Sequence, residues 1–255
     1  MEKNDYSGFG QYNISDKLQL ILPKTHIIIE KKENRFSYYR KNSEDQELRK
    51  SVPGKKDALQ IELAPVLPLN LPSKKTNDLM FLRLKESIFI EKNSTVDILL
   101  QFPIEIGVFV LNNDNTRDFF DCFTCEPMHS RFALYGTPEN GNLCMYGKVA
   151  QLEESEKPEP YVFAKIKATI SNQLKEGVSI GKLIFPVGHH EMYYLENTSD
   201  AHIDDVAATV KKESSGKIIE IRHVDLSKKG KKWNISLRLK PKSIKEAYIM
   251  SRGFD

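Results

Sequence analysis

The sequence predicts an all-β protein of two β-sandwich-like domains with a short C-terminal helix. Apolar residues fill every second position from Val162 to Ile170, as in a strand with one solvated face. Short apolar runs recur about every ten residues over 79–102, with polar turns between them, which is typical of a sandwich or barrel. Pro65 and Pro68 impose an extended course, as a strand crossing between two sheets requires.

The domain division rests on residues 151–160, which read QLEESEKPEP. This segment is acidic, contains prolines and is almost free of apolar side chains, as exposed connections between domains are. We therefore expect an N-terminal β-sandwich-like domain over residues 1–151 and a C-terminal β domain over residues 160–255. Limited proteolysis within the linker should then release two folded fragments.

Two shorter segments lack clear strand patterns. Residues 42–57 are charged with almost no apolar periodicity, which predicts an exposed loop. Residues 243–250 form the best helix candidate, because Ser243 can cap the first turn and Glu246 follows three positions later.

Composition limits the classes of function. The 255 residues carry 38 Lys and Arg against 35 Asp and Glu, a net charge of +3, so no strong nucleic-acid signal is present. Three cysteines, an odd number, fit a reducing compartment better than a disulfide framework. No stretch has the apolar length of a signal peptide or a transmembrane segment, which predicts a cytoplasmic protein.

The central stretch offers one candidate ligand site. Glu105 lies on a predicted strand, and the favoured interpretation is an exposed glutamate on the outer face of a sheet. The functional alternative is an ion pair between Glu105 and Arg131 that supports a pocket beside the loop at residues 136–141, with Tyr135 and Glu139. That loop contains two glycines and predicts a hairpin with its turn at Asn140-Gly141.

Cysteine and histidine offer a second candidate. Four residues within the span 122–144 are types that bind zinc, namely Cys122, Cys125, His129 and Cys144. Their spacing matches no recognised zinc motif, so we favour free thiols packed as small apolar groups and expect no cofactor, with zinc as the alternative. His189 and His190 are adjacent, and neighbouring residues on a strand face opposite ways, which predicts polar surface residues rather than metal ligands.

Three phrases carry a resemblance to a known family. APVLPLNLP at 64–72, FPIEIGVF at 102–109 and FALYGTPENG at 132–141 resemble, in this order and spacing, an archaeal family catalogued as domain of unknown function 432. The resemblance covers most of the chain and implies an archaeal origin, but no reaction. Cys122 and Cys125 are not part of the family pattern, so any role for them would be peculiar to this protein.

These observations favour a non-catalytic intracellular protein. No catalytic motif of low false-positive rate is present, so enzyme function is unsupported. We expect a protein-binding or accessory module whose partner is another protein, and the resemblance adds a membrane protein as one candidate. The alternative is a small-molecule-binding or catalytic protein with its site near Glu105, Arg131 and the loop at residues 136–141.

Overall fold

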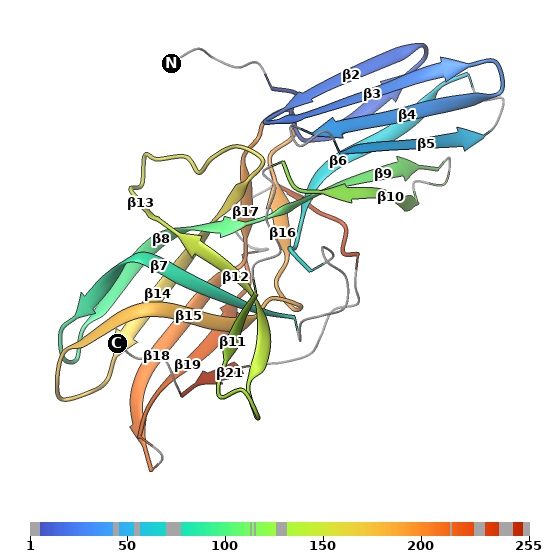
Figure 1. Ribbon diagram of the computed structural model, residues 1–255. Helices are drawn as coiled ribbons and strands as arrows, with labels where there is room; N and C mark the ends of the chain where they lie inside the picture. Colours follow the sequence, from blue (N-terminus) through green and yellow to red (C-terminus); the bar gives the residue numbers. More distant parts are fainter. Residues whose placement is uncertain are drawn as a thin grey trace.

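The computed structural model describes residues 6–42, 46–53, 57–69, 78–112, 114, 116–125, 132–214, 216–226, 233–239 and 247–251. Every regular element in this part of the chain is a β-strand, so the predicted all-β class is confirmed. No helix that could cross a lipid bilayer occurs among these residues. The strands form four sheets, arranged in two lobes (Figure 1).

The smaller lobe, at the upper right of Figure 1, contains two four-stranded sheets. One is an antiparallel meander, in the order β2 (Lys17–Leu22), β3 (Thr25–Lys32), β4 (Arg35–Asn42) and β5 (Glu47–Pro53). The other has the order β1 (Gly10–Ile14), β6 (Leu59–Val66), β9 (Glu105–Leu111) and β10 (Arg117–Phe123). Ile27, Ile29 and Tyr38 of the meander are buried, and the Tyr38 hydroxyl donates to Asp121 of β10. The two sheets therefore pack face to face as a sandwich.

The larger lobe also contains two sheets. A four-stranded sheet has the order β11 (Phe132–Tyr135), β12 (Asn142–Val149), β7 (Leu79–Ile90) and β15 (Val178–Pro186). A nine-stranded sheet runs β20 (Asn234–Ile235), β16 (Met192–Tyr194), β17 (Ala201–Ile203), β14 (Phe163–Asn172), β18 (Asp205–Glu213), β19 (Gly216–Val224) and β21 (Ala247–Met250), with β8 (Thr95–Pro103) beside β14 and β13 (Gln151–Leu152) beside β8. The alternation predicted around Val162 to Ile170 is that of β14, whose inward residues are buried.

The chain passes between the lobes after β6, after β8 and after β10. Strands from both sides of the predicted linker at residues 151–160 consequently share sheets. β8 pairs with both β13 and β14, and β7 pairs with β15. The predicted boundary at residues 151–160 therefore lies between strands that share a sheet. The chain crosses from one lobe to the other elsewhere, after β6, β8 and β10.

Two predicted elements are wrong. Residues 247–250 of the predicted C-terminal helix form β21, which pairs with β19, and residues 243–246 lie outside the described part. The edge of β19 supplies backbone partners that no sequence pattern shows, and they override the local helix signal. Residues 47–53 of the predicted loop form β5, which pairs along β4.

A buried polar contact joins the lobes. Glu62 of β6 is fully buried and accepts a hydrogen bond of 2.9 Å from the Tyr194 hydroxyl of β16. Arg117 of β10 lies 2.7 Å from the other carboxylate oxygen of Glu62. Phe9 packs on Tyr194 and Tyr161, with ring centroids 5.9 and 4.8 Å away. Because a buried carboxylate is stable only when it is paired, Glu62 fixes how β6 and β16 meet.

Candidate functional site

Glu105 is not on the surface. It is fully buried in the smaller lobe, so the favoured interpretation of an exposed glutamate is wrong. The Cys122 thiol lies 3.4 Å from Glu105 Oε2 and donates to it, so the structure joins residues that the sequence placed in two different candidate sites. The predicted partner Arg131 lies outside the described residues. At the nearby Gly107, a Cβ atom would lie 2.8 Å from the Phe109 ring, so the protein's own core packs closely against the backbone there.

Beside Glu105, Asp121 anchors the meander to the second sheet. It accepts hydrogen bonds from the Tyr38 hydroxyl at 2.8 Å and from Arg40 Nε at 2.7 Å. Lys50 reaches inward to the Phe120 carbonyl, and its ammonium lies 3.9 Å from Asp121. Burial raises the pKa of Tyr38, and the neighbouring Asp121 carboxylate raises it further. The tyrosine therefore stays a neutral donor, and the group is a structural anchor with its partners already in place.

The three thiols are poor nucleophiles and do not converge on a metal. Burial raises the pKa of Cys122, of Cys125 to about 12 and of Cys144 to about 11, so all three remain protonated at neutral pH. Cys122 belongs to β10 in the smaller lobe, whereas Cys144 belongs to β12 in the larger lobe and donates to the Asn142 carbonyl. Among the described residues no group of three or more potential ligands is arranged around a metal. The fourth predicted ligand, His129, lies outside them.

The loop at residues 136–141 joins β11 to β12 as predicted for a hairpin. The residue with positive φ is Gly136, at 122°, rather than Asn140 or Gly141. The Tyr135 hydroxyl accepts a 2.6 Å hydrogen bond from the Ser251 amide, and its ring lies 6.4 Å from that of Tyr248 on β21. Glu139 is exposed at the turn. Tyr135 and Glu139 thus belong to this hairpin in the larger lobe, whereas Glu105 belongs to the smaller lobe.

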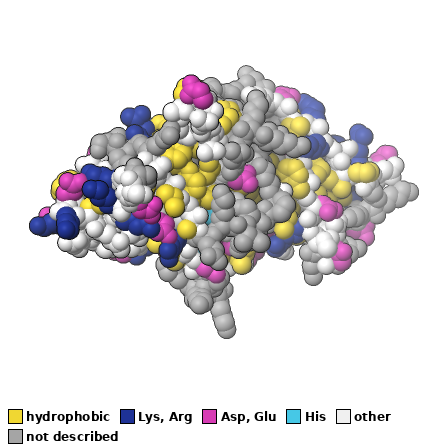
Figure 2. All heavy atoms as spheres, turned by 90° about the horizontal axis from the view of Figure 1, so that it is seen from below, with side chains coloured by type: hydrophobic (Ala, Val, Ile, Leu, Met, Phe, Trp, Pro, Cys, Tyr) yellow, Lys and Arg dark blue, Asp and Glu magenta, His cyan; other side chains and the backbone are white. Residues whose placement is uncertain are grey.

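The same hairpin exposes an apolar pair. Leu134 of β11 lies directly opposite Leu143 of β12, and the two residues are 44% and 36% exposed. β11 is the outer strand of its sheet. The hairpin lies near the lower end of the larger lobe in Figure 1, and the face of the molecule seen from below carries hydrophobic side chains at its surface (Figure 2).

A cluster of histidines was missed because His189 and His190 lie in a turn, where strand alternation does not apply. His189 and His190 are 7% and 1% exposed, so the prediction of surface residues is wrong. Their rings lie 6.2 and 5.0 Å from the ring of His223 on β19. Asp204, fully buried, lies 2.8 Å from His223 Nε2 and accepts hydrogen bonds from the Tyr193 hydroxyl and the backbone amides of Glu191 and Leu226.

His190 is the least satisfied member of this cluster. Neither ring nitrogen has a hydrogen-bonding partner among the described residues. Burial, followed by the charges of His223, His189 and Arg238, holds the pKa of His190 well below its ordinary value. The ring is therefore neutral at pH 7 and enclosed, so it cannot exchange protons with a substrate in solution.

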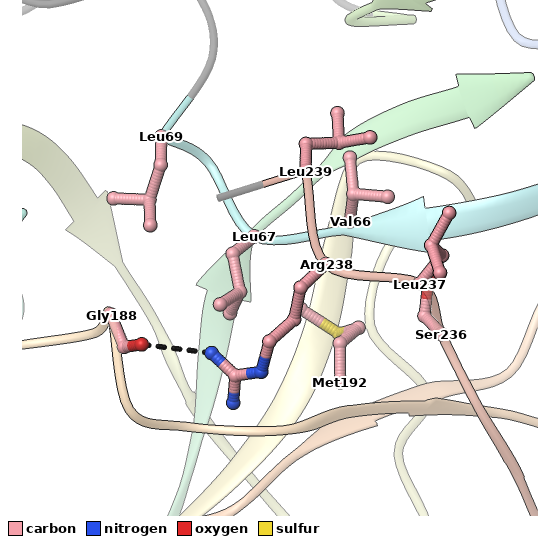
Figure 3. Close-up of a pocket in the computed structure, with 9 residues that line it drawn as sticks. All are labelled: Val66, Leu67, Leu69, Gly188, Met192, Ser236, Leu237, Arg238 and Leu239. Atoms are coloured by element: carbon pink, nitrogen blue, oxygen red, sulfur yellow. Dashed lines mark hydrogen bonds between the residues drawn. The ribbon is translucent and has the colours of Figure 1, made fainter. Parts of the chain in front are cut away.

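Figure 3 shows the small cavity beside this cluster. Arg238 points across it and donates to the Gly188 carbonyl at 2.8 Å, and Arg238 also forms an ion pair with Glu191 at 3.0 Å. The other lining residues are mostly apolar, namely Val66, Leu67, Leu69, Met192, Ser236, Leu237 and Leu239. Its volume of about 20 Å³ leaves room for a single water molecule and excludes an organic ligand.

Comparison with known proteins gives one match. The sequence model of a family described as "Protein of unknown function (DUF432)" matches residues 8–251. No curated protein matches the chain, and no solved structure matches it.

Proposed function

The chain belongs to the DUF432 family of proteins of unknown function, and we propose that it is a non-catalytic binding protein that docks another protein on the β11–β12 hairpin. The exposed, cross-strand pair of Leu134 and Leu143 on an outer strand carries this proposal. Among the described strands β11 has a neighbour on one side only, and exposed apolar side chains at a sheet edge are a recurrent feature of protein-binding surfaces.

The buried ionisable groups support a non-catalytic role. Asp121 and Asp204 each accept hydrogen bonds from other groups of the protein. Glu105 lies in the core beside a protonated thiol. A catalytic acid, base or nucleophile must reach its substrate at hydrogen-bonding distance. These groups instead stabilise the fold. Nothing in the described part of the chain favours the small-molecule alternative around Glu105.

The edge position of β11 indicates the form of the partner. An outer strand presents backbone amides and carbonyls that an extended segment can pair with, and alternate apolar side chains of that segment would cover Leu134 and Leu143. We therefore infer a partner with an extended, alternating apolar segment that adds as a further strand beside β11. A membrane protein with such a segment outside the bilayer is one candidate.

Photocrosslinking tests this proposal. Two variants carry the photoreactive residue p-benzoylphenylalanine, one in place of Leu134 and one in place of Val224. Val224 lies on β19, is 41% exposed and serves as the matched control. After irradiation in native cells, we expect one discrete protein adduct at position 134 and none at position 224. The adduct should disappear when Leu143→Asp is added, while the melting temperature stays within a few degrees of the parent.

Mass spectrometry then decides the mode of binding. The crosslinked peptide should have alternating apolar residues without helical periodicity. The same adducts at both positions, or an adduct that survives Leu143→Asp, would exclude the hairpin as the docking surface. A crosslinked peptide with helical periodicity would contradict strand addition.

A further inference from the structure

The β2–β5 meander concentrates positive charge that the whole-chain composition conceals. Residues 17–53 contain nine Lys and Arg against five Asp and Glu, a net charge of +4, whereas the full chain has a net charge of +3. The remaining residues together therefore have a net charge of −1. A basic face on a protein that is otherwise nearly neutral attracts a polyanion, because its field acts on the partner before contact.

The outward side chains of the meander are arranged in rows. β2, β3 and β4 bury alternate residues and β5 half-buries them, while antiparallel pairing aligns the other residues across the outer face. The first row contains Gln19, Ile28, Tyr39 and Arg49, the second contains Lys17, Glu30, Ser37 and Ser51, and the third places Lys32 opposite Arg35.

This outer face is hollowed. A shallow depression of about 580 Å³ lies over β3, β4 and β5 and is lined by most of these outward residues. The hollow lies on a sheet face that is open to solvent and flanked by polar side chains, so it suits a polymer laid across the strands better than an enclosed small molecule.

Cations outnumber acids on the outer face. Five outward positions are basic, namely Lys17, Lys32, Arg35, Lys41 and Arg49, and two are acidic, namely Glu30 and Glu47. Glu30 contacts Lys32, and Glu47 lies 3.2 Å from Arg49. Among the described outward positions of these four strands, five cations therefore stand against two carboxylates.

The hollow also contains a stacked planar pair. The Arg49 guanidinium lies 4.6 Å above the centre of the Tyr39 ring, and the Tyr39 hydroxyl donates to Glu47 at 2.8 Å. A guanidinium and a phenol held in this way offer flat surfaces on which bases stack. An acidic peptide would match the positive charge, but it has no bases to stack on this pair. A flat bilayer surface cannot follow the hollow.

We propose that the outer face of the β2–β5 meander binds single-stranded nucleic acid. Lys17, Lys32 and Arg35 contact phosphates, and one base stacks against the Arg49–Tyr39 pair. This site is separate from the β11–β12 hairpin and does not depend on the protein-binding role proposed above.

Fluorescence anisotropy with a labelled twelve-nucleotide oligothymidylate tests the proposal on the full chain. We expect saturable binding at 50 mM salt that weakens linearly on a plot of log K against log salt concentration. Lys32→Glu with Arg35→Glu should weaken binding at least about tenfold and flatten the salt slope. Tyr39→Ala should weaken binding while leaving the salt slope unchanged. Tyr39→Phe, which keeps the aromatic ring, should bind with the affinity of the parent.

A matched control separates local from global charge. Arg83 and Lys148 are also exposed cations that lie directly opposite each other, on β7 and β12 of the larger lobe. Arg83→Glu with Lys148→Glu changes the net charge by the same amount and should leave affinity within about twofold of the parent. Equal loss in this control, absence of saturable binding, or tighter binding to phosphatidylserine vesicles than to the oligonucleotide would each overturn the proposal.

Discussion

The two lobes each present a solvated sheet face, but the charges on these faces are organised differently. On the nine-stranded sheet of the larger lobe acids and bases lie close together: Asp97 contacts Lys167 at 2.7 Å, and Glu220 contacts Lys211 at 2.8 Å as well as Arg222. On the meander two acids face five bases. Locally balanced charge cancels at a distance, whereas an excess of one sign produces a field that a partner can follow.

This contrast is hidden in the charge of the whole chain. A net charge of +3 over 255 residues predicted no strong nucleic-acid signal, and this average includes the basic β2–β5 sheet. The charges of residues 42–57 predicted a loop, so the sequence did not show that β5 belongs to this sheet. In the structure, β5 turns Lys50 inward to Asp121 and leaves Arg49 outward, and only tertiary pairing distinguishes the two.

The largest effect is expected from dividing the chain at the predicted linker. Fragments 1–151 and 160–255 separate β8 from β14 and β7 from β15, so each fragment loses hydrogen-bonding partners and exposes core residues. We expect neither fragment to show a cooperative unfolding transition by circular dichroism. Two cooperative transitions, one in each fragment, would instead support the domain division predicted from the sequence.

The next largest effect concerns the anchor beneath the basic face. Asp121→Ala leaves the Arg40 guanidinium, whose side chain is 13% exposed, without its carboxylate, and it leaves the Tyr38 hydroxyl without its acceptor. Removing one partner of a buried pair costs about 3–5 kcal/mol. Urea denaturation should show this loss in the free energy of unfolding. A cost below about 1 kcal/mol would show that the anchor behaves as a surface pair.

The sequence predicted those parts of the fold that depend on local alternation. β8, β14 and the β11–β12 hairpin occur where alternating apolar residues and turn signals placed them. The helix prediction for the C-terminal segment was wrong because the conformation of this segment depends on pairing with the edge of β19. The crossings of the chain between the lobes leave no mark in composition, because a composition change marks exposure rather than topology.

The candidate site was less predictable than the fold. Glu105 and Cys122 meet because β9 pairs with β10, yet the sequence assigned them to separate sites. The Asp204 and His223 pair joins the turn after β17 to β19, and no motif marks it. Burial of charged residues is set by packing between distant strands, which spacing along the chain does not encode.

A third, smaller effect tests the histidine cluster. Burial lowers the pKa of His190 in the folded protein, so the unfolded chain binds a proton at higher pH than the native state does. The neutral His190 therefore makes its full contribution to the free energy of unfolding above about pH 6.5, the ordinary histidine pKa. Below that pH this contribution falls by up to about 1.4 kcal/mol per pH unit. His190→Phe should reduce the slope of unfolding free energy between pH 5 and 6.5. An unchanged slope would assign the acid sensitivity to other groups.

The smallest effect is expected on the balanced face of the larger lobe, and it completes the contrast with Asp121. Asp97 accepts a 2.6 Å hydrogen bond from the Thr169 hydroxyl and pairs with Lys167, yet the Lys167 and Asp97 side chains are 36% and 54% exposed. Water and salt screen such a pair, so Asp97→Asn should change the free energy of unfolding by less than about 1 kcal/mol, and 0.5 M salt should remove most of that difference. The measurement is the same urea titration used for Asp121→Ala. Similar costs for both variants would mean that burial does not separate anchoring charges from exposed ones here.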